Sequence, residues 1–230
     1  MKIALLFAAR NFVGPEYFRA LCEAGLEPDL VVTVGRFRDD QIHRETARTG
    51  GLWQPDPIPE TRIEARFDGL ADSALWKLLR DRQIDAAVQG GIGILKPEML
   101  NVPRIGFVNV HPGRLPNYRG NSCPEWAVLN GESVFLTAHL IDEGIDTGPV
   151  ILERPYRVDP DWGYEAFRAG LYPQCGSVMA DALAILRDAG DDWPECLTPQ
   201  NASEGTYRPA ISTDELDQVK SKFPTYSARP

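Results

Sequence analysis

Cysteine is scarce in this sequence, and its spacing excludes two kinds of site. The four cysteines among 230 residues lie far apart and form no C-x-x-C pair: Cys22, Cys123, Cys175 and Cys196. Zinc sites and redox motifs usually contain such pairs, and small disulfide-rich domains need a denser set. We therefore expect no metal site and no disulfide framework, but reduced thiols in a cytoplasmic protein.

Long hydrophobic runs are also missing. The apolar stretch at residues 1–9 is short, and Arg10 and Asn11 follow it directly. A membrane span needs roughly 20 consecutive apolar residues. The stretch therefore predicts a buried first strand rather than a signal peptide, and we expect no membrane association.

Basic residues are outnumbered by acidic ones. The 24 Lys and Arg residues face 33 Asp and Glu residues, which gives a net charge of −9. Proteins that bind nucleic acid usually present a basic face to the phosphates. An acidic total leaves room for a local basic patch, but it disfavours a tRNA-binding surface, and we expect no nucleic acid partner.

The dinucleotide-binding fingerprint is absent as well. The first predicted strand leads into residues 9–14, where Gly14 is the only glycine, so no G-x-G-x-x-G follows it. The Gly-Gly-Ile-Gly at residues 90–93 is an incomplete match after a later strand. A nicotinamide-dependent dehydrogenase is therefore disfavoured.

What the chain does contain is an alternation of strands and helices. The β-loop-α-β start predicts an α/β fold, with a Rossmann-like, mostly parallel sheet and helices on both faces. We place the main domain at residues 1–187 and a short C-terminal extension at 188–230. The patterns predict strands at 2–8, 30–34, 86–89, 107–111, 134–141, 150–158 and 206–208, and helices at 15–25, 41–48, 71–82, 97–100, 124–129, 164–186 and 213–222. The helix at 164–186 is expected to be irregular near Pro173.

Two polar side chains stand together at one predicted strand end. Asn109 and His111 point to the same face of the strand at 107–111, because side chains alternate along a strand. The strand stops at Pro112, because proline cannot donate to a continuing ladder. A lone Asn at a strand end is more often a turn residue, and a lone His is more often a polar group whose hydrogen bonds are satisfied. Side by side at a buried strand end, they indicate a site of chemistry.

This region closely resembles the formyltransferases that use 10-formyltetrahydrofolate, a family that acts on methionyl-tRNA, glycinamide ribonucleotide or sugar-nucleotide amines. The matching pieces are Asn109-x-His111, Leu115-Pro116-x-x-x-Gly120, and Asp146-x-Gly148, which begins 35 residues after His111. Residues 86–97 are similar to the family's folate-binding strand and loop. The resemblance extends to about residue 185 and implies that residues 1–187 form a catalytic domain.

The resemblance also implies roles for three residues. Formyl transfer needs hydrogen-bond donors where negative charge develops and a group that takes the amine's proton. Asn109 would supply two N–H donors, His111 would supply a third when protonated, and Asp146 would favour the imidazolium and accept the proton through water. Asp146 stands one residue closer to the histidine than the family pattern places it. The difference falls near the turn at 131–133, where a deletion should leave the loop geometry intact.

Two loops are expected to hold the pterin ring of the folate. Glycines let a flat ring approach the backbone, and the aliphatic side chains provide apolar walls. Ordinary strand-loop packing is the alternative. The predicted cofactor-binding residues are Gly90, Gly91, Ile92, Gly93, Ile94, Leu95, Ile141, Asp142, Glu143, Gly144 and Ile145.

Three further residues carry a less specific signal. His139 is predicted to be a buried, hydrogen-bonded core residue rather than a second base, and His43 to be solvated. Cys123 lies near His111 in sequence, but the spacing of a base and an orienting group known from cysteine enzymes is absent.

The class of acceptor is predicted from the features in which this chain differs from each branch of the family. Glycinamide ribonucleotide enzymes carry a Gly-Asn-Gly-Ser phosphate loop where this chain has residues 8–11, and methionyl-tRNA enzymes carry a further basic domain. The resemblance therefore favours the compact sugar-nucleotide N-formyltransferases, with a nucleotide-linked amino sugar as acceptor and an amino-acid-like amine as the alternative. In that group the C-terminal segment often pairs subunits, so we expect residues 188–230 to contact the substrate or a second copy in a homodimer. The predicted acceptor-binding residues are Arg10, Asn11, Pro112, Tyr118 and Arg119, because arginine suits phosphate.

Two other classes of function stay open. A hydrolase would pass the formyl group to water and release formate without an amine. A non-catalytic folate- or nucleotide-binding module would keep its biological activity when His111 is replaced by alanine.

Overall fold

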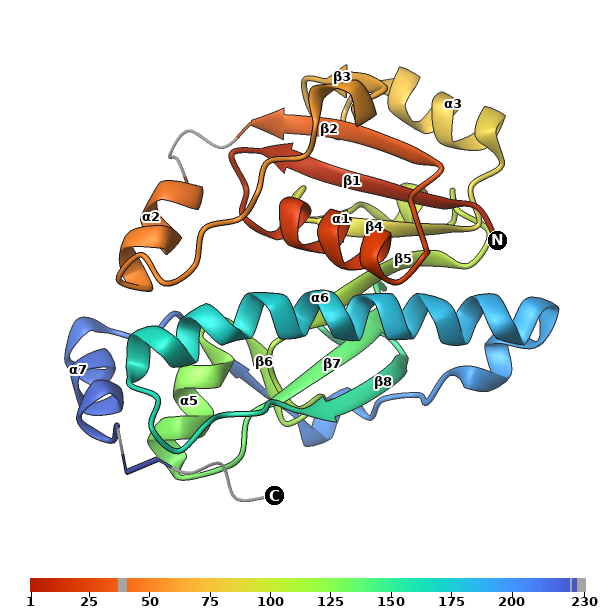
Figure 1. The fold of residues 1–230 in the computed structure, drawn as a ribbon. Coiled ribbons are helices and arrows are strands. Elements are labelled where there is room, and N and C mark those ends of the chain that lie inside the picture. Colours follow the sequence, from red (N-terminus) through yellow and green to blue (C-terminus); the bar gives the residue numbers. More distant parts are fainter. Residues whose placement is uncertain (37–40, 224, 227–230) are drawn as a thin grey trace.

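A computed structural model describes residues 1–36, 41–223 and 225–226; residues 37–40, between the strand predicted at 30–34 and the helix predicted at 41–48, lie outside the described residues. The main sheet has seven strands in the order β3-β2-β1-β4-β5-β7-β8 (Figure 1). The first five strands in the chain run parallel, and the last two pair antiparallel. Their bounds are β1 Ile3–Ala9, β2 Leu30–Arg36, β3 Ala65–Phe67, β4 Ala86–Gly90, β5 Gly106–His111, β7 Phe135–Leu140 and β8 Val150–Pro155. This confirms the predicted α/β class with a mostly parallel sheet.

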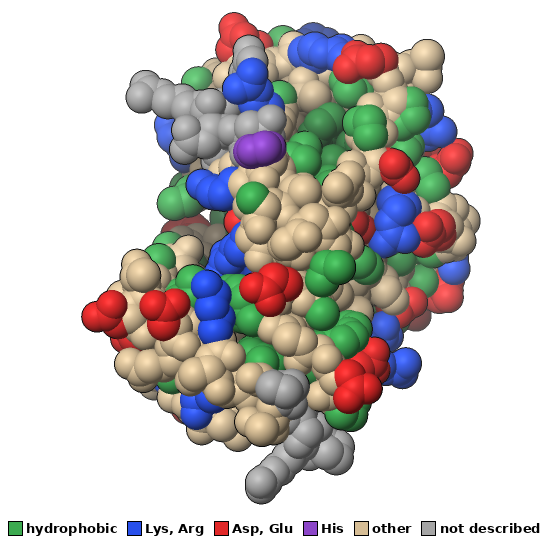
Figure 2. All heavy atoms as spheres, turned by 60° about the vertical axis from the view of Figure 1, so that its left-hand side comes forward, with side chains coloured by type: hydrophobic (Ala, Val, Ile, Leu, Met, Phe, Trp, Pro, Cys, Tyr) green, Lys and Arg blue, Asp and Glu red, His purple; other side chains and the backbone are tan. Residues whose placement is uncertain are grey.

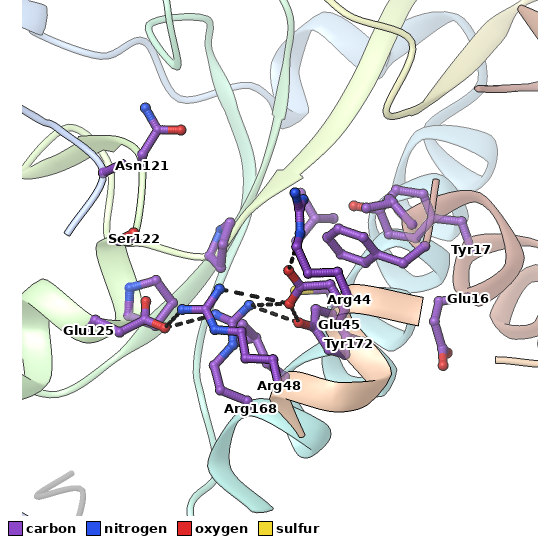
Figure 3. A pocket seen from close by; sticks show the side chains of 18 residues that line it. Glu16, Tyr17, Arg44, Glu45, Arg48, Asn121, Ser122, Glu125, Arg168 and Tyr172 are labelled. Atoms are coloured by element: carbon purple, nitrogen blue, oxygen red, sulfur yellow. Dashed lines mark hydrogen bonds and ion pairs between the residues drawn. The ribbon is translucent and has the colours of Figure 1, made fainter. Parts of the chain in front are cut away.

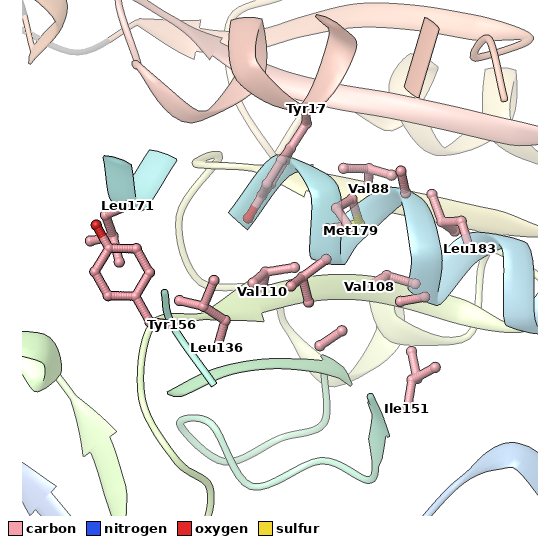
Figure 4. Packing of buried hydrophobic residues seen from close by; sticks show 14 of the residues in the cluster. Tyr17, Val88, Val108, Val110, Leu136, Ile151, Tyr156, Leu171, Met179 and Leu183 are labelled. Carbon is pink, nitrogen blue, oxygen red and sulfur yellow. The ribbon is translucent and has the colours of Figure 1, made fainter. Parts of the chain in front are cut away.

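Helices cover both faces of the sheet. Strand β1 is buried on both sides: Leu5 belongs to a core cluster with α1 (Val13–Glu23) and α6 (Tyr164–Ala189), whereas Leu6 packs with α3 (Ser73–Arg82). Figure 4 shows the first cluster, in which Val108 and Val110 of β5 lie next to α6. A continuous apolar run is what a strand covered on both faces requires.

The smaller elements connect these layers. They are α2 Gln41–Arg48, η1 Glu60–Arg62, α4 Pro97–Leu100, β6 Tyr118–Gly120, α5 Cys123–Asn130, η2 Gly190–Cys196, η3 Ala202–Glu204, β9 Thr206–Arg208 and α7 Thr213–Ser221. Two expectations need correction. Helix α6 continues across Pro173 without a break, held by its buried stripe against the sheet. Strand β8 is shorter than predicted and ends at Pro155, which has no N–H for a further ladder bond.

The C-terminal segment packs against the body of the protein. Strand β9 pairs parallel with β6, and α7 begins with a capping box in which Ser212 and Glu215 bond each other's backbone N–H groups. Val219 is fully buried, and the hydroxyl of Tyr226 donates to the Glu132 carbonyl at 2.7 Å. The segment therefore contributes to the core. Its contact with a second subunit stays a prediction.

No helix within the described ranges combines the length and the hydropathy needed to cross a membrane.

The docking of α7 can be measured. Val219→Ala should lower the free energy of unfolding by about 2 kcal/mol, because two buried carbons are removed and a cavity remains. Gln218→Ala, at an exposed position of the same helix, is the control and should change it by less than about 0.5 kcal/mol. Urea unfolding measures both, and equal effects would mean that α7 is not docked on the core.

Candidate active site

The predicted polar pair lies at the carboxyl end of β5. Strand β7 runs antiparallel beside it and places His139 opposite Asn109 and Thr137 opposite His111. Because side chains alternate, Asn109 and His111 face one side of the sheet, while Val110 faces the α1 and α6 side. The loop after β7 returns to this strand end and carries Asp146.

His111 is enclosed, and both of its ring nitrogens face acceptors. Only 4% of the residue is exposed. Its Nε2 lies 2.7 Å from the Tyr118 carbonyl oxygen, and its Nδ1 lies 3.4 Å from Oδ2 of Asp146. A carbonyl can only accept, so Nε2 carries the proton of the neutral ring. A proton added to the ring is therefore held at Nδ1, facing the carboxylate.

Burial decides the charge of this imidazole at neutral pH. It lowers the pKa of His111, while the Asp146 carboxylate and the bond to the Tyr118 carbonyl oppose it. The pKa of His139 is lowered in the same way, chiefly by burial, with Asp146 again opposing. Two neutral imidazoles thus stand beside one carboxylate.

Asp146 is fixed by the main chain. Its backbone has φ 55°, in the left-handed region that few residues other than glycine adopt. The Gly120 N–H donates to Oδ2 at 2.9 Å, and the Asp146 carbonyl accepts from Nε2 of Gln200 at 3.3 Å. The structure thus brings Asp146 to His111 despite the one-residue difference in spacing.

His139 orients the amide of Asn109. Its Nδ1 donates to the Leu140 carbonyl at 2.8 Å, which leaves Nε2 as an acceptor. Nδ2 of Asn109 donates to that Nε2 at 3.4 Å. Oδ1 of Asp146 lies 3.8 Å from the same Nε2. The residue is buried and hydrogen-bonded, as predicted. Its link to Asn109 was not predicted, although pairing of the two strands in register would have revealed it.

Two neighbours define the wall around His111. A β-carbon on Gly113 would lie 2.7 Å from Nε2 of His111, so only glycine fits there. Burial raises the pKa of the Cys123 thiol to about 12, with Asp146 and Glu125 adding to the effect. A thiol in that state is a poor nucleophile at neutral pH, which agrees with the sequence-based judgement.

The predicted folate loops are partly packed and partly open. Gln89 braces the first loop by donating to the Gly93 carbonyl and accepting from the Gly91 N–H. Ile92 and Leu95 are buried in the α3-side core cluster. In contrast, Ile94 is 81% exposed and, in the second loop, Ile145 is 49% exposed. Gly90, Gly91 and Gly93 continue the first loop, while Ile141, Asp142, Glu143 and Gly144 complete the second.

The predicted acceptor residues do not gather in one place. Pro112 lines a cavity of about 460 Å³, whereas Arg10 and Asn11 line a separate cavity of about 410 Å³ beside the ends of β1 and β2. The ring of Tyr118 is buried, with its hydroxyl accepting from Asn130. The guanidinium of Arg119 lies near Gly205 in the C-terminal segment.

The cavity beside Pro112 has charged walls that the sequence did not reveal (Figure 3). Arg168 of α6 contacts Glu125 of α5 at 3.2 Å and Glu45 of α2 at 3.3 Å. Arg48 reaches Glu125 at 2.8 Å, and the hydroxyl of Tyr172 donates to Glu45. Burial alone would raise the pKa of Glu125, but the two arginines outweigh it and lower the pKa, so the carboxylate is charged.

No group of three or more His, Cys, Asp and Glu side chains in the described ranges is arranged to hold a metal ion.

Comparison with known proteins identifies a matching family and similar sequences. The sequence model of the formyl transferase family, described as "Formyl transferase", matches residues 1–182. A methionyl-tRNA formyltransferase of Agathobacter rectalis is 32% identical over 202 residues, which cover 85% of this chain and 61% of the relative. The chain spans less than two thirds of the length of the first curated relatives that it matches.

Solved structures share the fold. Phosphoribosylglycinamide formyltransferase from Streptococcus pneumoniae superposes with a TM-score of 0.57 at 23% identity, over 81% of this chain and 98% of that one. A sugar N-formyltransferase from Shewanella gives a TM-score of 0.55 at 15% identity, over 92% and 77% of the two chains.

The titration of His111 tests the electrostatics of the site. Its NMR midpoint should lie below about 6.5, the value of an exposed imidazole, because burial disfavours the cation. Asp146→Asn removes the larger of the two effects that raise the pKa, so the midpoint should fall further. A midpoint above 6.5, or a rise in the Asn variant, would contradict this description.

Proposed function

The chain belongs to the formyl transferase family, and we propose that it transfers a formyl group from 10-formyltetrahydrofolate to the primary amine of a small molecule. The observation that carries this proposal is the convergence of Asn109, His111 and Asp146 at the buried end of β5. An amide donor, a neutral imidazole and a carboxylate at one strand end are the groups that acyl transfer to an amine requires.

The residues predicted to hold the folate fit such a group. Ile94 and Ile145 are large apolar side chains exposed on the two loops, where a flat ring would cover them. Gly93 has a positive φ and open space where a β-carbon would stand. The cosubstrate supplies the activated formyl group, and these loops supply its apolar seat.

Each polar residue has a defined task in this proposal. Neutral His111 takes a proton at Nδ1, and the resulting imidazolium is stabilised by the Asp146 carboxylate 3.4 Å away. The Asn109 amide has two N–H donors, of which one is directed to His139. The other is available where negative charge develops on the formyl oxygen. His139 is thus a positioning residue for Asn109.

Two acceptor classes are supported by different observations. The charged lining of the cavity beside Pro112 and the net charge of −9 favour a polar small molecule, and among the alternatives a nucleotide-linked amino sugar. The identity to relatives named methionyl-tRNA formyltransferase favours an aminoacyl amine. We propose the amino sugar first and the amino-acid-like amine second.

The activity can be tested with purified protein, 10-formyltetrahydrofolate and a panel of amino sugars, their nucleotides and amino-acid amides. Formation of tetrahydrofolate and of the N-formyl product, measured by absorbance and mass spectrometry, should depend on the amine. His111→Gln should lower kcat by about 10²- to 10⁴-fold, because the group that takes the proton is lost. His43→Gln, which changes an exposed histidine, is the control and should leave kcat unchanged.

The same assay separates the competing functions. Formate released at equal rates with and without amine would identify a hydrolase. Turnover that is absent throughout, with folate binding retained, would identify a binding module and overturn the transferase proposal.

A further inference from the structure

The Asp146 carboxylate lies on a loop whose main chain is held from outside the loop. Asp146 has φ 55°, a conformation that residues other than glycine keep only where surrounding contacts hold it. Within the loop, Oδ1 of Asp142 accepts from the Gly144 N–H at 3.1 Å and from the Thr147 hydroxyl at 2.6 Å. These bonds involve neither the carbonyl of Asp146 nor that of Gly148, so the support of this part comes from elsewhere in the chain.

Gln200 supplies that support from beyond α6. Its Nε2 donates to the Asp146 carbonyl at 3.3 Å and to the Gly148 carbonyl. Close to it in the chain, Thr198 and Val150 exchange two backbone N–H···O bonds, each of 2.8 Å, which fix Gln200 beside the loop. Figure 1 shows the chain after α6 returning past β8 to this place.

The same segment also holds the strand that contacts His111 and Asp146. Strand β9 pairs in parallel with β6, which contains the Tyr118 carbonyl facing Nε2 of His111 and the Gly120 N–H that donates to Asp146. A β-carbon on Gly120 would lie 2.5 Å from the Arg208 carbonyl oxygen of β9, so the close approach of the two strands requires glycine there. The segment therefore reaches the imidazole and the carboxylate from two directions, through β6 and through the loop.

Gln200 is not the residue that stability alone would favour. Its Oε1 is buried and has no hydrogen-bond partner in the described part of the chain. A buried oxygen without a partner lowers the free energy of unfolding. Methionine has nearly the same length and would avoid that loss, but it cannot donate to a carbonyl. The ability to donate is therefore what glutamine adds at this position.

Gln200 and β9 lie beyond residues 1–182, the part of the chain that the formyl transferase family model matches. We propose that Gln200 is a positioning residue for formyl transfer: it fixes the Asp146 loop so that the carboxylate stays against His111. The inference rests on the proposed function and adds a residue that acts through Asp146. A displacement of about 1 Å in a reacting group lowers rates by up to about 10²-fold, so loss of this support should appear in turnover.

Gln200→Met removes the donors and keeps the length of the side chain. The Asp146 carboxylate raises the pKa of His111 against the effect of burial, so a displaced carboxylate should lower the NMR titration midpoint of His111. The other titratable side chains beside this ring, His139 and Cys123, are unchanged. The midpoint should fall by no more than it does in Asp146→Asn, and kcat for formyl transfer should fall by about tenfold to 10²-fold.

A double variant separates positioning from a purely structural role. In the Asp146→Asn background, Gln200→Met should lower neither the midpoint nor kcat further, because the carboxylate that it positions is gone. A residue needed only for stability would lower the unfolding temperature and would act equally in both backgrounds. If Gln200→Met does not fold, Gln200→Asn, which keeps the amide on a shorter side chain, should give the same two changes.

Two controls accompany these variants. Thr198→Val changes an exposed side chain of the same segment, whose pairing with Val150 uses main-chain atoms, and should leave the midpoint and kcat unchanged. Arg44→Gln removes a surface charge, because the Arg44 side chain is 57% exposed, and Figure 2 shows Lys and Arg side chains on the face to which α2 belongs. Exposed charges are screened by salt, so this variant should leave the His111 midpoint unchanged.

The outcomes separate this inference from the proposed function. A lowered midpoint in Gln200→Met, in a protein that transfers no formyl group, would overturn the proposed function and leave Gln200 as the support of Asp146. Formyl transfer by the wild type, with midpoint and kcat unchanged in both Gln200 variants, would overturn the inference and leave the proposed function standing. A fall in kcat that is equal with and without the Asp146 carboxylate would also overturn the inference.

Discussion

A partly buried carboxylate beside two buried imidazoles is the constraint on which this site depends. Asp146 brings a charge to an enclosed strand end, where a charge without partners is strongly unfavourable. The Gly120 N–H donates to it, and the unprotonated Nδ1 of His111 and Nε2 of His139 lie 3.4 Å and 3.8 Å from its oxygens, so the carboxylate stabilises a proton that either ring takes up. These partners come from three different segments, so the antiparallel addition of β7 to a parallel sheet is what makes the site possible. Strands β1 to β4 carry none of these groups.

The end of β5 also separates two environments. Asn109 and His111 face one side of the sheet, together with the predicted folate loops, while Val110 faces the side of α1 and α6. The cavity lined by Pro112 and the Glu–Arg network opens on that second side. In a sheet of this type, ligands bind beyond the carboxyl ends of the strands.

Much of the fold and part of the site followed from the sequence. The doubly buried strand β1 was readable from its apolar run, and helix α2 from the Gly50-Gly51 break that follows it. The placement of Asn109 and His111 on one face was readable from strand alternation. The role of Tyr118 could not be predicted from the sequence. Its carbonyl oxygen, rather than its ring, contacts His111, and side-chain patterns give no information on main-chain atoms. Glu45, Glu125 and Arg168 were missed because three distant elements bring them together without any local motif. Gln200 reaches the Asp146 loop from the C-terminal segment for the same reason.

The most direct test of the central claim is a double-mutant cycle on kcat/KM for turnover of 10-formyltetrahydrofolate, with His111→Gln, Asp146→Asn and the pair combined. If Asp146 acts through the imidazole, the two losses are strongly non-additive, and the double variant is about as slow as His111→Gln alone. Losses that multiply independently would show that the carboxylate and the imidazole do not act as a unit, and would contradict this account of the site.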